Sequence, residues 1–282
     1  MNLRKAEEKL FNILMRIAAC IIFGSLFAIS FTILVKGIPN MSWDMISKTP
    51  SGGFYLGKEG GILNAIIGSF YLAIGATIFA LILTIPMVIY MNVYASPNSR
   101  LSNIVRLCLD IMFGIPSIVY GAFGFVLMLF LGLKVSLLAG IVVVGLLILP
   151  IIARTMDEVM RNAPKELKDA SFSLGATKWE TAFKVMVRQS LPGLATAALL
   201  GFGRAIGDAA SVIFTAGFTD NIPHSINDPV ATLPLAIFFQ LSSPIAEVRE
   251  RAYAAALILT IIIFGISLLS RYLIKKYSKH TV

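Results

Sequence analysis

The sequence is poor in charged residues, because Asp, Glu, Lys and Arg make up only 14% of its 282 positions, whereas 57% are hydrophobic. So little polar surface cannot cover a water-soluble globule of this size, and a mean hydropathy of +0.84 agrees with that conclusion. We therefore exclude a soluble enzyme. The net charge of +9 does not favour nucleic-acid binding, because basic residues in such an apolar chain usually lie in loops beside lipid.

Cysteine and histidine are nearly absent, with two residues of each. Cys20 and Cys108 supply neither a disulfide framework nor metal-ligand spacing, and the two histidines are isolated. The segment from Gly52 to Lys58 matches a nucleotide-binding P-loop, but Glu59 replaces the hydroxyl residue that would bind magnesium. We interpret the match as chance, and we expect no catalytic residue, metal site or cofactor in this chain.

Long apolar runs dominate the sequence, and a helix needs roughly 20 apolar residues to cross the hydrocarbon of a bilayer. Six runs satisfy this length, although the fifth contains Arg204 and Asp208. They are residues 17–35, 62–94, 111–133, 135–153, 191–217 and 252–270. The predicted fold class is therefore an all-α integral membrane protein with six transmembrane helices.

Residues 229–246 form another uncharged run, but it contains Pro229, Pro234 and Pro244, which argue against a lipid-facing helix. With six spans, both termini lie on one side of the membrane, and that side holds 17 of the 24 basic residues. Because basic loops stay cytoplasmic, we predict that both termini are cytoplasmic in the cell membrane. A seventh span would place the basic C-terminal tail outside.

The chain divides into three predicted parts. Residues 1–61 hold the cytoplasmic N-terminus, an anchor helix and an outer loop. Residues 62–270 form one transmembrane domain with a cytoplasmic helix at about 164–180, and residues 271–282 form a basic cytoplasmic tail.

Two charges interrupt the fifth run. A charge at a helix centre costs about 2.5 to 3.5 kcal/mol on insertion scales, whereas each large apolar residue returns only about 0.3 to 0.6 kcal/mol. The run therefore requires neighbouring helices. Arg204 and Asp208 are spaced i, i+4, which favours an ion pair on one helix. One interpretation is a purely stabilising salt bridge; the other is that Arg204 offers its guanidinium to an anion along a pathway while Asp208 limits the affinity.

The long predicted loop at 154–190 contains the pattern of two short helices. Pro164 suits a helix start with Glu166 near it, and Gly175 suits a left-handed stop before a second helix that contains Trp179. Such an amphipathic element must cover its apolar face. A helix lying on lipid is one interpretation, and a docking element for another protein is the other.

Asp169-Ala170-Ser171, followed after three residues by Gly175, resembles the EAA loop of ABC transporter permeases. Four further segments are similar to the phosphate-uptake branch of that family and extend the resemblance from about residue 60 to residue 270. They are residues 175–181, residues 113–121 with Pro-Ser-Ile-Val, residues 204–208 with Arg-Ala-Ile-Gly-Asp, and the late segments 232–235, 242–244 and 252–254. The sequence is thus identified as a member of the PstA-type phosphate ABC transporter permeases.

The sequence departs from that family at four positions. Asp169 and Asp208 replace the usual Glu, which keeps the charge but shortens its reach, whereas Val93 replaces a common Glu and Arg188 a common Pro. We have no interpretation for the last two.

The resemblance implies the type I ABC importer permease fold (MetI-like) and a transmembrane subunit that imports inorganic phosphate without enzymatic activity of its own. The implied pathway residues are Arg204, Asp208, Ser117 and Tyr120. The implied ATPase-coupling residues are Glu166, Asp169, Ala170, Ser171, Gly175, Ala176, Thr177 and Trp179. The implied partners are a second, PstC-like permease, two PstB-like ATPases that bind ATP and magnesium, and a PstS-like extracytoplasmic phosphate-binding protein.

Two alternatives to a phosphate permease stay open. A permease for another oxyanion or a phosphonate would share the coupling loop. An ATP-independent anion channel or secondary transporter would use residues 165–180 only as an interfacial helix. A membrane enzyme is the weakest of the alternatives, because no catalytic constellation is recognised.

Overall fold

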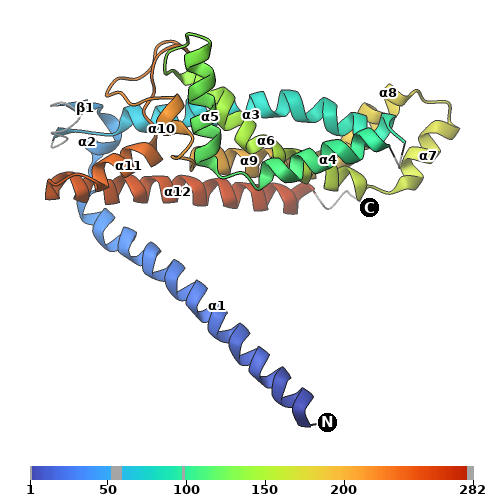
Figure 1. Cartoon of the computed structure of the whole chain (residues 1–282), viewed down its shortest axis with the longest axis horizontal. Coiled ribbons are helices and arrows are strands. Elements are labelled where there is room, and N and C mark those ends of the chain that lie inside the picture. The colour runs from blue at the N-terminus through green and yellow to red at the C-terminus, as the bar shows by residue number, and fades with distance from the viewer. Residues whose placement is uncertain (1, 52–58, 97–98, 278–282) are drawn as a thin grey trace.

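The computed structural model of the chain describes residues 2–51, 59–96 and 99–277, and it is almost entirely helical (Figure 1). The P-loop match at 52–58 and the last five residues of the basic tail lie outside these described residues. The elements in chain order are α1 (Asn2–Gly37), η1 (Ile38–Asn40), α2 (Trp43–Ser47), β1 (Pro50–Ser51), β2 (Glu59–Gly60), α3 (Leu63–Ile89), η2 (Tyr90–Tyr94), α4 (Arg100–Phe113), α5 (Ser117–Phe130), α6 (Leu137–Arg161), α7 (Lys165–Ser173), α8 (Lys178–Glu180), η3 (Thr181–Met186), α9 (Val187–Ile206), α10 (Val212–Thr215), α11 (Leu233–Leu241) and α12 (Ala246–Tyr277).

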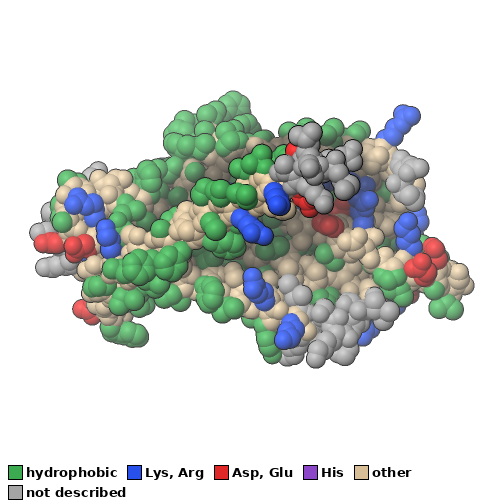
Figure 2. Space-filling model, turned by 90° about the horizontal axis from the view of Figure 1, so that it is seen from below, with side chains coloured by type: hydrophobic (Ala, Val, Ile, Leu, Met, Phe, Trp, Pro, Cys, Tyr) green, Lys and Arg blue, Asp and Glu red, His purple; other side chains and the backbone are tan. Residues whose placement is uncertain are grey.

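Among the described residues, five helical stretches are long and apolar enough to cross a membrane, and the bent pair α4–α5 makes a sixth if it is one span. This confirms the predicted class of a multi-span helical membrane protein. Hydrophobic side chains cover much of the face drawn in Figure 2, as expected for a surface that lipid or other subunits cover. Residues 229–246 form the short helix α11 and a turn, so the prediction that this run is not a span agrees with the structure.

The predicted third span at 111–133 is wrong as a single helix. The chain breaks at residues 114–116, and α4 and α5 meet at an angle of 100°, so that α5 stands across the long axis of the bundle in Figure 1. The physical reason is local, because Pro116 cannot continue a helix and disfavours helical geometry at the residue before it. The apolar run therefore contains a sharp bend between two helices.

The core is built where α3, α6, α9 and α12 run side by side along the long axis (Figure 1). Small residues allow these helices to approach closely. A Cβ at Gly201 of α9 would lie 2.4 Å from the side chain of Ile152 of α6, which is itself fully buried. Helices in a membrane associate through close packing of this kind, because the hydrophobic effect does not drive helices together in lipid.

The predicted fifth span ends earlier than expected. Helix α9 stops at Ile206 with Gly207 as its cap, so Asp208 does not lie on a helix. Apart from the single turn of α10, the chain then runs irregularly to α11. Hydrogen bonds hold its main chain, among them Ser136 N to Thr215 O (3.0 Å) and Val230 N to Ala216 O (2.9 Å). Irregular backbone at membrane depth is tolerated where protein surrounds it in this way.

The predicted loop at 154–190 is also shorter than expected. Helix α6 continues to Arg161, α7 occupies Lys165–Ser173, and the helical stretch that leads into α9 begins at Lys178. Of the two departures from the family pattern that have no interpretation, Val93 is buried in η2 and Arg188 is exposed on α9, and nothing in the structure explains either.

The two ends of the bundle differ. Elements α2, β1 and β2 form a small cap at one end, and α7 and α8 lie at the other (Figure 1). Helix α1 leaves the bundle beside α12 and projects away from it, and its apolar side chains, such as Phe23 and Phe27, are exposed in the isolated chain.

Candidate functional site

The structure brings Arg204 and Asp208 together, but not as neighbouring turns of one helix. Arg204 lies in the last turn of α9, whereas Asp208 follows the helix cap, and their charged groups are 3.7 Å apart. The Asp208 side chain is only 3% exposed and accepts hydrogen bonds from the main-chain N–H (3.0 Å) and the hydroxyl of Ser211. The Arg204 side chain is 48% exposed. The carboxylate is therefore fixed inside the fold, while about half of the Arg204 side chain remains accessible.

Helix α5 meets this region at Gly121. A Cβ at Gly121 would lie 2.8 Å from the Cα of Ser211 and 3.0 Å from the carbonyl oxygen of Ala210, so only glycine permits this approach. The two segments with proposed pathway residues, 117–121 and 204–211, thus lie against each other although they are far apart in sequence.

Ser117 and Tyr120 sit at the start of α5, next to the break, and both are half-buried. The Tyr120 hydroxyl donates a hydrogen bond to the carbonyl oxygen of Met112 in α4 (2.9 Å), across the 100° corner. Tyr120 therefore holds the corner together, a role that the sequence did not reveal.

The predicted helix–glycine–helix element exists as α7 and α8, with Gly175 between them at φ +81°. Residues other than glycine rarely adopt this left-handed conformation, which ends α7. Thr177 and Glu180 then form a capping box: Thr177 Oγ1 accepts from Glu180 N (3.2 Å), and Thr177 N donates to the Glu180 carboxylate (3.1 Å). We call residues 165–180 the coupling hairpin.

The surface of the coupling hairpin combines charge with exposed apolar groups. Leu174 is 88% exposed and Trp179 is 63% exposed. The centroids of the Trp179 and Phe183 rings are 4.2 Å apart. The other predicted coupling residues that face outward are Glu166, Asp169, Ala170, Gly175 and Thr177, while Ala176 is half-buried. Large exposed apolar side chains on a polar hairpin indicate a contact surface for another molecule.

Ser171 differs from the other predicted coupling residues, because it is buried. Its hydroxyl forms a hydrogen bond with the hydroxyl of Thr181 (2.9 Å). This contact joins α7 to η3, the segment that leads into α9. A second contact joins α7 to the core, since Lys168 Nζ donates to the carbonyl oxygen of Asn92 in η2 (2.9 Å).

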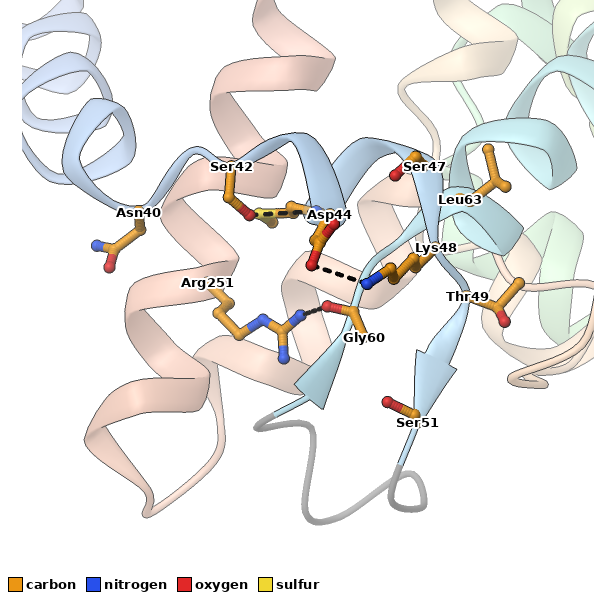
Figure 3. Close-up of a pocket in the computed structure, with 11 residues that line it drawn as sticks. Asn40, Ser42, Asp44, Ser47, Lys48, Thr49, Ser51, Gly60, Leu63 and Arg251 are labelled. Carbon is orange, nitrogen blue, oxygen red and sulfur yellow. Dashed lines mark hydrogen bonds and ion pairs between the residues drawn. The ribbon is translucent and has the colours of Figure 1, made fainter.

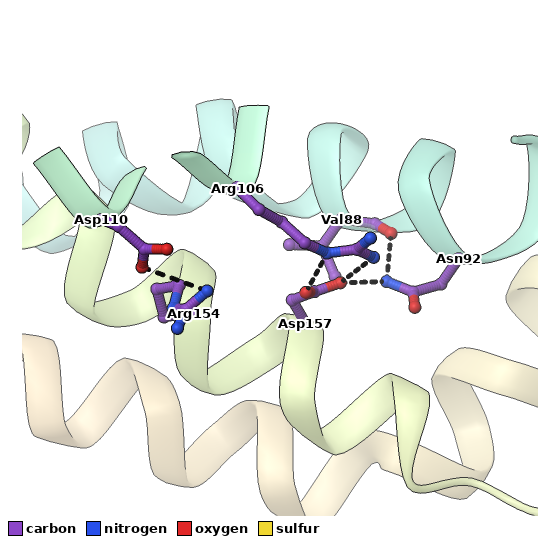
Figure 4. A network of polar contacts seen from close by, with 6 residues as sticks. All are labelled: Val88, Asn92, Arg106, Asp110, Arg154 and Asp157. Carbon is purple, nitrogen blue, oxygen red and sulfur yellow. Dashed lines mark hydrogen bonds and ion pairs between the residues drawn. The ribbon is translucent and has the colours of Figure 1, made fainter. Parts of the chain in front are cut away.

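The sequence analysis missed a buried ionic cluster directly behind the coupling hairpin (Figure 4). Asp157 of α6 accepts from Arg106 Nε (2.8 Å), from the Arg106 guanidinium terminus (3.1 Å) and from Asn92 Nδ2 (2.8 Å). The side chains of Arg106 and Asp157 are 18% and 4% exposed. Nearby, Arg154 and Asp110 join the same two helices at 3.1 Å, but both are about half exposed. Asp157 was missed because residues 154–190 were read as a loop.

A cavity of about 840 Å³ lies at the opposite end of the molecule, under the cap (Figure 3). Arg251 of α12 donates a hydrogen bond to the carbonyl oxygen of Gly60 at its edge, and Asp44 pairs with Lys48 at 2.8 Å. The Arg251 contact joins the cap to α12, whereas the Asp44–Lys48 pair lies within the cap. None of the predicted site residues lines this cavity.

Comparison with known families gives a match over most of the chain. The family model described as binding-protein-dependent transport system inner membrane component matches residues 85–279. The phosphate transport system permease protein PstA of Haemophilus influenzae is 31% identical over 269 residues, which cover 95% of this chain and 94% of that protein. The probable ABC transporter permease protein YqgI of Bacillus subtilis is 29% identical over 281 residues and covers 94% of both chains.

Solved structures with a similar fold come from ABC transporters. The bacterial alginate ABC transporter aligns over 99% of this chain and 98% of its own with a TM-score of 0.66 at 14% identity. The MetNI methionine ABC transporter, in an inward-facing conformation, aligns over 75% of this chain and 95% of its own with a TM-score of 0.61 at 21% identity. These likenesses establish the fold as that of MetI-type permeases.

Proposed function

Because the chain belongs to the family of binding-protein-dependent transport system inner membrane components, we propose that it is the permease subunit of an ATP-driven importer for inorganic phosphate. Relatives that are about 30% identical over nearly their whole length carry the name of a phosphate permease, among them those of Haemophilus influenzae and Methanocaldococcus jannaschii. The observation that carries the proposal is the half-exposed side chain of Arg204 beside a carboxylate that is fixed by other partners.

A guanidinium suits a phosphate oxyanion, because it offers several N–H donors in a planar fork. At 3.7 Å, the Arg204–Asp208 contact is longer than a hydrogen bond, and the donors from Ser211 already occupy one Asp208 oxygen. Arg204 is thus available to an anion, while the negative charge of Asp208 nearby keeps the binding weak. A transport pathway needs that balance, since the anion must also leave.

The coupling hairpin is the proposed contact for two separate ATPase subunits, which would bind ATP and magnesium. Leu174 and Trp179 provide apolar contact area, and Asp169 and Glu166 provide charge around it. The hairpin lies at the extreme end of the bundle (Figure 1). This position favours docking with a protein over an interfacial helix lying along lipid. Closure of the ATPases on ATP would push the hairpin and rock the spans between two states.

The proposed orientation places the hairpin end in the cytoplasm and the cap end outside. Residues 154–190, which include the hairpin, carry seven of the 24 basic residues, which fits the positive-inside rule. In this orientation a phosphate-binding protein would dock over the cap, and a second permease would complete the pathway. Both partners follow from the family and are part of the proposal.

The test is uptake of labelled phosphate by vesicles that contain this chain with its candidate permease, ATPase and binding-protein partners. We expect unlabelled phosphate to compete fully, and sulfate and methylphosphonate to compete weakly at the same concentration. Full competition by one of these, with weak competition by phosphate, would replace phosphate by that ligand as the substrate.

A further inference from the structure

A continuous set of polar contacts leads from the coupling hairpin to Arg106 on α4, the helix that ends at the corner with α5. Lys168 of α7 donates to the Asn92 carbonyl, the Asn92 side chain donates to Asp157, and Asp157 is held by two N–H groups of Arg106 on α4. Figure 4 shows the central part of this set, where Asp157 lies between the side chains of Asn92 and Arg106.

Both polar contacts of α7 with the core end on π-helical segments. Lys168 reaches η2, and Ser171 reaches η3. A π-helical turn is wider than an α-helical one and is frequent at functional sites. These two segments are the places where the long helices are least regular next to the hairpin.

Beyond Arg106, helix α4 leads to the corner at 114–116 and to the contact of Tyr120 with Met112. The next residue after Tyr120, Gly121, packs on Ser211, which donates to Asp208. The contacts therefore connect the proposed ATPase surface with the proposed pathway through named atoms.

We propose that Asp157 is a positioning residue that transmits the movement of the coupling hairpin to the α4–α5 corner. The proposal rests on the proposed function. The buried Asp157 carboxylate joins three elements (η2, α4 and α6), so a shift of η2 under Lys168 moves α4 with it. Asp110–Arg154, a half-exposed pair between α4 and α6, is a matched control, because within the described part of the chain neither side chain forms a hydrogen bond or ion pair with the hairpin or with η2.

The experiment uses the complete complex in proteoliposomes and measures phosphate transported per ATP hydrolysed. For Asp157→Asn we expect assembly and ATP hydrolysis to persist while the ratio falls about tenfold, in the range of ordinary coupling between sites. Asp110→Asn should keep the wild-type ratio. Arg106→Asp combined with Asp157→Arg restores opposite charges, and the Asn92 amide can serve either charge, so this double variant should recover part of the ratio.

A wild-type ratio in Asp157→Asn, or an equal loss in Asp157→Asn and Asp110→Asn, would overturn the proposal. If Asp157→Asn does not assemble, Lys168→Met tests the same set of contacts. Lys168 lies on α7 at the surface, and its substitution removes the hydrogen bond to the Asn92 carbonyl. Its ratio should fall, whereas that of Lys134→Met, an exposed lysine outside the hairpin, should not; equal ratios would overturn the proposal.

Failure of the proposed function looks different. If the wild-type complex takes up no phosphate, the function is wrong. If the wild type couples uptake to hydrolysis and the Asp157 and Lys168 variants couple equally well, only the positioning role is wrong.

Discussion

Arg204 and Asp208 form an unequal pair: the carboxylate of Asp208 is buried and bound by Ser211, whereas half of the Arg204 side chain, 3.7 Å away, is exposed. Such a pair stabilises the fold through one partner only. An ion pair with one solvated member contributes little to the free energy of unfolding. Leaving a buried carboxylate without its donors, or the donors without the carboxylate, lowers that free energy much more. The two residues should therefore respond differently to substitution.

Asp208→Ala should destabilise the protein. The substitution leaves the main-chain N–H and the hydroxyl of Ser211 buried without their acceptor, at a cost of about 1 to 3 kcal/mol. Thermal unfolding of the purified chain in detergent measures the loss, with Arg204→Gln as the control that keeps near-wild-type stability. Equal unfolding temperatures for Asp208→Ala and wild type would contradict the anchoring role.

The apolar surface of the coupling hairpin should be needed for ATPase docking. Replacing both Leu174 and Trp179 by Ala removes two mostly exposed side chains and, within the described residues, the ring contact of Trp179 with Phe183, so the permease should stay folded. We expect the ATPase to be lost in co-purification. Phe130→Ala is the matched control, because Phe130 is 86% exposed at the far end of α5. Retention of the ATPase by the double variant would show that this surface faces something else.

Gly121→Ala should separate α5 from the 208–211 segment. The added Cβ would lie 2.8 Å from the Cα of Ser211, and overpacking of this kind costs typically about 1 to 3 kcal/mol. Both stability in detergent and phosphate uptake should fall. Gly265→Ala in α12 is the control, because a Cβ there meets no atom of the described residues within 4 Å. A neutral Gly121→Ala would mean that the two segments do not pack as described.

The long spans were predictable because an apolar run of sufficient length has few other structures available in lipid. The apolar run at 111–133 gave no indication of the corner, because the residues on both sides of Pro116 are apolar. Asp208 was placed on a helix because i, i+4 spacing assumes that the helix continues, and the end of α9 at Gly207 breaks that assumption. Local spacing does not reveal where a helix stops inside a bundle.

The coupling hairpin was predictable from Pro164, Gly175 and the Thr177–Glu180 cap, all of which act locally. Its attachment to the core was not, because Asn92 and Thr181 reach it only through the fold. Asp157 left a signal that was overlooked: Ala153, Met156 and Met160 continue the buried face of α6 at helical spacing, and Asp157 lies within that face. A charge on a buried stripe requires a partner, which is Arg106.

The most direct test is nucleotide-dependent uptake of labelled phosphate in vesicles that contain the complete complex, with assembly checked by co-purification. The account predicts ATP-dependent uptake by wild type, loss of the ATPase in Asp169→Lys, and an assembled complex without transport in Arg204→Gln. Flux that needs no nucleotide and is unchanged in both variants would contradict it.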